Sequence, residues 1–114
     1  MRQRAQLVLA IVATDTTFER REVRGEVVFV GRCIHCSSHL TIGARGETYG
    51  ATIEHIEPRT HGGTDALENV ALACARCNQQ KGARLDARRR DDATLSEVIE
   101  TLRRRRRERW RAPP

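Results

Sequence analysis

Two cysteine pairs with the same internal spacing constrain this chain of 114 residues more than any other feature of its sequence. Cys33 and Cys36 form one Cys-x-x-Cys pair, and Cys74 and Cys77 form a second after 37 intervening residues. A two-residue gap lets both thiolates of a pair turn toward one point, which suits a tetrahedral zinc ion about 2.3 Å from each sulfur. Disulfide frameworks usually scatter their cysteines more widely, so the spacing predicts a structural zinc site.

A bound metal ion would stabilise a chain whose composition provides few residues for a hydrophobic core. Only 39% of the residues are hydrophobic and 4% are aromatic, and small domains with such a thin core often need a cross-link. The apolar stretch at residues 7–13 has no small-residue cleavage site after it and is far too short to cross a bilayer. We therefore expect a cytoplasmic protein with reduced, metal-binding cysteines and no membrane partner.

The positive charge of the chain is concentrated near its C-terminus. Residues 1–80 carry nine basic and nine acidic groups, so the formal net charge of +6 comes entirely from the twelve basic and six acidic groups of residues 81–114. A basic arm on a neutral body predicts a polyanionic partner, with nucleic acid as the first candidate. The alternative is that the arginines only keep a small protein in solution.

Hydrophobic periodicity predicts one small domain of the α+β class. Residues 4–13 fit either a short helix or a strand, because so brief an apolar run does not reveal its period. A turn is expected at residues 43–46, Gly-Ala-Arg-Gly, as the centre of a hairpin. The other expected elements are strands at residues 23–30, 40–42, 48–56 and 70–73, a loop at 57–68, and helices at 76–83 and 94–110. In the last helix, apolar residues recur at i, i+3, i+4 and i+7 from Leu95, and Asp92 or Thr94 is expected to cap its start.

The most informative motifs lie between and around the cysteine pairs. Glu54 and His55 end a predicted strand and are followed by x-x-Pro-Arg and then by a Gly-Gly loop. Asn69 precedes the next strand, and Asn78 starts the helix that the second cysteine pair would hold, within Cys-x-x-Cys-Asn-x-x-Lys-Gly. An order of strand, loop, strand and helix lets residues that are distant in the chain converge on one small volume, and the zinc ion would hold the ends of the loop together.

In this order and at these spacings, residues 33–82 resemble the HNH nucleases of the His-Me finger (ββα-metal) superfamily. The resemblance implies a small ββα-metal core stapled by the zinc site. It also implies hydrolysis of phosphodiester bonds in nucleic acid, with DNA as the expected substrate and with 5′-phosphate and 3′-hydroxyl ends as products. The chain then divides into an N-terminal extension at residues 1–30, the nuclease core at 31–84 and a basic helical arm at 85–114.

The resemblance assigns roles to four residues. His55 matches the histidine that takes a proton from the attacking water, a task that suits an imidazole because histidine titrates near neutral pH. Asn69 matches the asparagine that braces the loop and orients this imidazole. Asn78 and Glu54 match two ligands of a catalytic divalent cation, Mg²⁺ or Mn²⁺. Glutamate stands where the family commonly has aspartate or histidine, so its longer side chain must fold back or bind through a water.

Basic residues are the candidate phosphate contacts. Three of them lie in or beside the motif: Arg59, Arg76 and Lys81. Five consecutive arginines in the last helix cannot all be buried, so most must face water or phosphate: Arg103, Arg104, Arg105, Arg106 and Arg107. Trp110 nearby either stacks on a base or packs against the last helix.

Several of these residues also have a plainer interpretation. Glu54 fits a surface carboxylate, and Asn78 fits a cap of the helix after Cys77. His35 and His39 lie in or beside the first cysteine pair, but four cysteines already fill a tetrahedron. For the whole chain, the alternative to an endonuclease is a non-catalytic, zinc-stabilised module that binds nucleic acid. A monomer suffices to nick one strand, whereas cutting both strands favours a homodimer.

Overall fold

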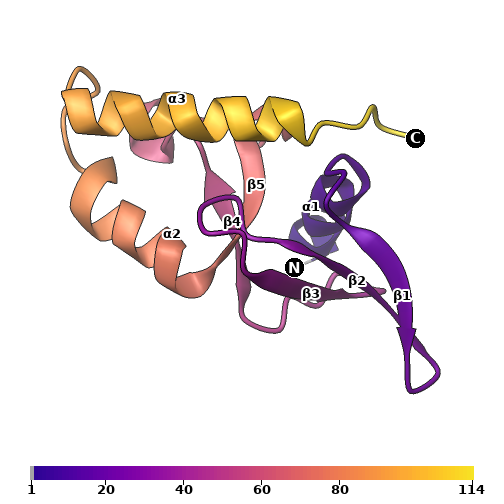
Figure 1. Ribbon diagram of the computed structural model, residues 1–114. Helices are drawn as coiled ribbons and strands as arrows, with labels where there is room; N and C mark the ends of the chain where they lie inside the picture. The colour runs from indigo at the N-terminus through magenta and orange to yellow at the C-terminus, as the bar shows by residue number, and fades with distance from the viewer. Residues whose placement is uncertain (1) are drawn as a thin grey trace.

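Three helices and two antiparallel sheets make up the structure, a computed structural model that describes residues 2–114 (Figure 1). The helices are α1 (Arg2–Ala13), α2 (Ala75–Lys81) and α3 (Ala93–Glu108). The strands are β1 (Glu19–Val23), β2 (Glu26–Arg32), β3 (His39–Gly43), β4 (Ala51–His55) and β5 (Val70–Cys74). These elements confirm the predicted α+β class. Within residues 2–114, no helix has both the length and the apolar composition that crossing a membrane requires.

The first sheet has the order β1-β2-β3, and its β1–β2 hairpin projects from the rest of the molecule (Figure 1). The strand predicted at residues 23–30 is confirmed for residues 26–30, which belong to β2, but its predicted start is wrong because the chain reverses at Arg24 and Gly25. Both residues have positive φ angles, 53° and 80°, as a two-residue hairpin turn requires. Arginine is an unusual residue at such a position, so the turn gave little signal in the sequence.

The second sheet pairs β4 with β5, with Ile53 opposite Leu72. The hairpin predicted around residues 43–46 is therefore wrong: β3 pairs with β2, and the turn leads from one sheet to the other. Gly46 has a φ of 90°, and a Cβ there would lie 2.7 Å from the carbonyl oxygen of Ala5. This close approach fixes the turn against α1.

The β4–loop–β5–α2 segment has the order that the resemblance implies. The loop between β4 and β5 contains two short 3₁₀ turns, Arg59–His61 and Leu67–Asn69, and β5 follows directly with four buried residues. Helix α2 begins immediately after β5 and continues as a π-helical turn at Gly82–Asp86. The loop, the strand after it and the helix predicted at residues 76–83 are thus confirmed.

The hydrophobic core lies where α1 and α3 pack against the sheets. The undecided segment at residues 4–13 is helical, and its buried residues Val8, Ile11 and Val12 recur at the spacing of one helix face. On α3 the predicted apolar positions Leu95, Ile99 and Leu102 are buried. The two helices therefore cover the sheets with amphipathic faces.

Helix α3 begins as predicted, because the Asp92 carboxylate accepts a hydrogen bond from the backbone N–H of Leu95 at 3.0 Å. This bond satisfies one of the free donors of the first turn. It is also the main reason why the pKa of Asp92 lies below its usual value. Of the two predicted caps, Asp92 therefore fills the role.

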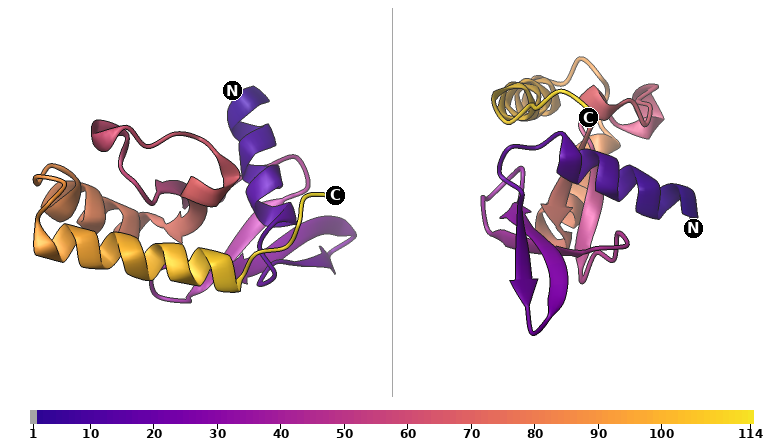
Figure 2. Two further views of the ribbon diagram at one scale, coloured as in Figure 1. Left: turned by 90° about the horizontal axis from the view of Figure 1, so that it is seen from above. Right: turned by 90° about the vertical axis from the view of Figure 1, so that its right-hand side faces the viewer.

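The C-terminal end of α3 lies beside the end of α1 (Figure 2), and a buried arginine joins them. Arg106 is 1% exposed. Its guanidinium donates to the carbonyl oxygen and hydroxyl of Thr14 and to the carbonyl oxygen of Leu67, at 2.7–3.2 Å. It also lies 4.9 Å from the centre of the Trp110 ring. Trp110 thus packs at the end of α3, and Arg106 is not free to bind phosphate as its place in the arginine run suggested.

Replacing Arg106 with alanine should destabilise the fold by about 3 kcal/mol, because it removes the guanidinium bonds to the Leu67 carbonyl and the Thr14 hydroxyl and leaves the Thr14 carbonyl with the backbone N–H of Arg111 as its donor. The neighbouring exposed Arg107→Ala should change stability by less than about 0.5 kcal/mol. Urea unfolding of both variants measures the difference. Equal stabilities would mean that the buried guanidinium contributes nothing to the fold.

Candidate active site

The four cysteines meet at one point. Cys33 and Cys36 lie in the turn after β2, Cys74 ends β5 and Cys77 lies in the first turn of α2. Their sulfur atoms are within 4.8 Å of one another, and the Cys36 and Cys74 sulfurs are 4.0 Å apart. A tetrahedral zinc site with bonds of about 2.3 Å separates its sulfurs by roughly 3.8 Å. The cluster is therefore positioned to form a metal site and is compatible with zinc.

The pKa values of the clustered thiols differ from one another, and these differences indicate that the cluster suits a cation. Bonds from the hydroxyl and backbone N–H of Ser38 lower the pKa of Cys36 to about 6. Burial and the neighbouring thiols raise the pKa of Cys77 to about 12, and burial raises that of Cys33. Four thiolates cannot share this volume without a positive charge, whereas a bound metal ion deprotonates such thiols outright.

A cysteine variant tests this centre. The wild-type protein should carry one zinc ion per chain, and Cys77→Ser should lose it together with several kcal/mol of stability, since metal binding is folding free energy in sites of this kind. Elemental analysis and thermal unfolding measure the two effects. Gln80→Ala, an exposed position on the same helix, is the matched control. A Cys77→Ser protein that keeps its full zinc content would contradict the four-sulfur site.

Glu54 belongs to a buried polar network. Its carboxylate is 1% exposed, with Oε1 at 2.6 Å from His35 Nε2 and Oε2 at 3.1 Å from Lys81 Nζ. His35 therefore faces Glu54 and not the sulfur cluster. Because successive side chains of a strand point to opposite faces, Glu54 and its neighbour His55 leave β4 on different sides.

Lys81 is the centre of this network. Its side chain is 2% exposed, and its ammonium donates to the backbone carbonyl of His55 at 3.0 Å and to Asp86 Oδ1 at 2.8 Å, besides pairing with Glu54. With three partners, this ammonium has no free direction toward a ligand. The phosphate contact predicted for Lys81 therefore does not fit the structure, because the lysine joins α2 to β4 inside the protein.

His55 lies on the other side of β4, with 19% of its side chain exposed. Its Nε2 is 2.7 Å from Asp65 Oδ1 and 3.3 Å from Arg59 Nε, and the Arg59 guanidinium also contacts Asp65 at 3.2 Å. The bond from His55, followed by that from Arg59, lowers the pKa of Asp65. The shorter contact favours an Nε2–H that donates to Asp65, which leaves the lone pair on Nδ1.

Asp65 was not among the predicted site residues. The sequence shows an aspartate in a polar loop ten positions after His55, and such a position is typical of turn residues. Its contact with the imidazole arises only because the loop folds back over the end of β4.

Asn69 fixes that fold of the loop. Its Oδ1 accepts from the backbone N–H of Glu57 at 2.8 Å, and its Nδ2 donates to the carbonyl oxygens of Glu57 and Thr64. The loop can close this tightly only at a glycine, because a Cβ on Gly63 would lie 1.8 Å from the Glu57 carbonyl oxygen. Asn69 thus braces the segment that carries Asp65.

Asn78 lies within α2 and makes no cap of that helix. Its Nδ2 donates to the Thr52 hydroxyl at 2.9 Å and to the Ile53 carbonyl oxygen at 3.1 Å. Because both acceptors lie on β4, the amide nitrogen is committed to that strand. The amide oxygen Oδ1 is the atom left for a further partner.

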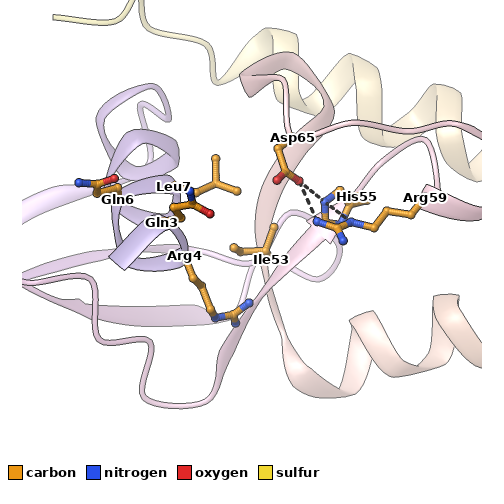
Figure 3. A pocket seen from close by; sticks show the side chains of 8 residues that line it. All are labelled: Gln3, Arg4, Gln6, Leu7, Ile53, His55, Arg59 and Asp65. Atoms are coloured by element: carbon orange, nitrogen blue, oxygen red, sulfur yellow. Dashed lines mark hydrogen bonds and ion pairs between the residues drawn. The ribbon is translucent and has the colours of Figure 1, made fainter. Parts of the chain in front are cut away.

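Two cavities meet at His55. A smaller one of about 290 Å³ is lined by Glu54, Asn78 and Asp86 together with His55. A larger groove of about 750 Å³ runs between the end of β4 and helix α1, and Figure 3 shows His55, Arg59 and Asp65 on the side opposite the α1 residues. Glu54, His55 and Asn78 are therefore among the residues that line one cavity, although the side chains of Glu54 and His55 leave β4 on different sides, and His55 also lines an open groove.

The arginines of α3 divide into two groups. Arg103 pairs with Glu57 at 3.0 Å, and Arg105 donates to the backbone carbonyls of Ile34 and His35, so both hold the helix to the rest of the protein. Arg104 and Arg107 are exposed on α3, as are Arg59 and Arg76 in the motif. Most of the predicted arginine run is thus occupied by contacts within the described chain.

Comparison with known proteins adds one finding. A family model described as HNH endonuclease matches residues 33–84. This range agrees with the extent of the resemblance seen in the motifs, and it contains all four cysteines. No curated protein and no solved structure gave a match.

Proposed function

We propose that this protein is a metal-dependent endonuclease that hydrolyses phosphodiester bonds in DNA, because residues 33–84 match the family model of HNH endonucleases. The observation that carries the proposal is the position of His55. This residue lines both an open groove and a smaller cavity to which Glu54, Asn78 and Asp86 also contribute. A general base must reach a water near both substrate and cation, and this position supports that role.

The residues of the smaller cavity fit a divalent cation. Glu54 and Asp86 offer carboxylate oxygens and Asn78 offers an amide oxygen, the hard donors that Mg²⁺ and Mn²⁺ prefer. Both carboxylates already pair with Lys81, so they would be shared with a bound ion. When bound, the cation would neutralise charge on the scissile phosphate and on the departing 3′-oxygen.

In the proposed mechanism, Asp65 fixes the tautomer of His55, the general base. Asp65 holds Nε2 of His55 protonated, as the aspartate of a catalytic triad fixes its histidine tautomer, so Nδ1 is free to accept a proton from water. The resulting hydroxide attacks phosphorus, the bond to the 3′-oxygen breaks, and the leaving oxygen takes a proton from solvent water, so that the products carry 5′-phosphate and 3′-hydroxyl ends. Arg59, exposed beside the imidazole, is suited to hold the phosphate in the groove.

A second candidate function is a zinc-stabilised module that binds nucleic acid without cutting it. One observation favours it: both oxygens of the Glu54 carboxylate already have partners, His35 and Lys81. A carboxylate so engaged satisfies a buried network without any cation. Cleavage measurements separate the two functions directly.

The His55→Ala variant should lose metal-dependent nicking of a supercoiled plasmid by at least about 100-fold, since this is the usual contribution of a general base. Reactions with Mg²⁺, Mn²⁺ or EDTA, followed on agarose gels, measure the loss. His39→Ala removes an exposed histidine from the other sheet and should nick as the wild type does. Band shifts without cleavage under every metal would support the binding module. Equal nicking by His55→Ala and wild type would instead remove His55 from the role of general base.

Asp65→Asn should slow cleavage by roughly 10–100-fold at saturating metal, because an amide can present the wrong hydrogen-bonding group to Nε2 and no longer fixes the tautomer. Stability should stay close to that of the wild type, since Asp65 is exposed. Single-turnover rates measure the effect, with the exposed Asp91→Asn as control. An unchanged rate would remove Asp65 from the proposed mechanism.

A further inference from the structure

Helix α1 lies outside the residues that match the nuclease family, yet it forms one wall of the groove that contains His55. We propose that this wall is a DNA-binding surface, in which Arg4 contacts a backbone phosphate of the strand that passes His55. The inference rests on the proposed function for the position of the cut. The binding surface itself can be measured without cleavage.

The groove-facing side of α1 is polar, while its other side is fixed in the core. Gln3, Arg4 and Gln6 are exposed and line the groove, and Leu7 is half-buried beside them. Figure 3 shows these side chains across from His55, Arg59 and Asp65, with Ile53 between the two groups. Because the opposite face of α1 is buried and Ala5 touches Gly46, the wall is held in place before any ligand arrives.

The charges of the groove fit a phosphate backbone. Arg4 on α1 and Arg59 on the loop face the groove from opposite walls, and residues 2–13 contain no acidic residue. Asp65 is the one acidic residue of the lining, and its charge is already balanced by Arg59 and by the bond from His55. Guanidinium groups are the preferred partners of phosphate oxygens.

The uncharged residues of the groove fit the rest of a nucleotide. Leu7 and Ile53 offer apolar surface to a sugar or a base, and Gln3 and Gln6 offer amides that can bond to base edges or to the sugar-phosphate backbone. A strand that runs from Arg4 toward His55 would bring a phosphodiester to the mouth of the smaller cavity. The arginine run of α3 is a weaker candidate for this strand, because Arg103, Arg105 and Arg106 already bond within the protein.

Binding to a fluorescein-labelled DNA duplex in EDTA tests the inference, with fluorescence anisotropy at several salt concentrations. Arg4→Gln should weaken binding by roughly tenfold and reduce the slope of log K against log salt by about 0.9, the effect of one lost phosphate contact. Arg20→Gln is the matched control: it removes the same charge from exposed β1, which does not line the groove. Unfolding midpoints of both variants should equal that of the wild type.

The outcomes separate this inference from the proposed function. Equal affinity and salt slope for Arg4→Gln and wild type would overturn it, and so would equal losses in Arg4→Gln and Arg20→Gln. Displacement of the duplex by poly-glutamate as readily as by unlabelled DNA would also overturn it, in favour of an acidic protein partner. A selective loss in Arg4→Gln supports the α1 surface even if the wild type fails to nick DNA. A wild type that neither binds nor nicks would overturn both proposals.

Discussion

The convergence of four cysteine sulfurs is the constraint on which the rest of the structure depends. It joins the turn after β2 to the junction of β5 and α2, two segments that are far apart in the chain. The Cys33 sulfur also accepts hydrogen bonds from the backbone N–H groups of His35 and Cys74. These two bonds hold the turn after β2 against the junction of β5 and α2. From the same turn, His35 reaches Glu54 on β4. The cluster and the strand that carries the candidate base therefore belong to one bonded network.

The elements that a local sequence pattern determines could be predicted, whereas the pairing of strands that are distant in the chain could not. Strand β5, the helix after it and α3 follow from the periodicity of apolar residues and from capping residues. The spacing of the cysteines predicted their cluster. The errors concern strand pairing. Alternation continues through Arg24 and Gly25 although the chain reverses there, and the turn at residues 43–46 looks like a hairpin although β3 pairs with β2. Pairing is set by packing between distant segments, which periodicity does not report.

The candidate site shows the same division. The motif identified His55, Asn69 and Asn78 as candidates, and the structure brings all three to the β4–β5 hairpin and its helix, but their chemical roles remain proposals. What the sequence could not reveal is which charged residues find partners. Lys81, expected to contact phosphate, is buried among acceptors, and Asp65, for which no role was expected, contacts the imidazole of His55. A sequence reports that a charge exists, whereas burial and neighbours determine what it does.

The β1–β2 hairpin has a bearing on how two molecules can meet. In the described sheet β1 pairs only with β2, so its outer edge presents unpaired backbone groups that would invite another strand. The residues along this edge are charged, and full antiparallel overlap of residues 19–22 from two copies would oppose Glu19 to Glu22 and Arg20 to Arg21. Like charges directly opposite each other destabilise a strand pair. Full overlap of the β1 edges, which would continue the sheet from one molecule into the next, is thereby discouraged.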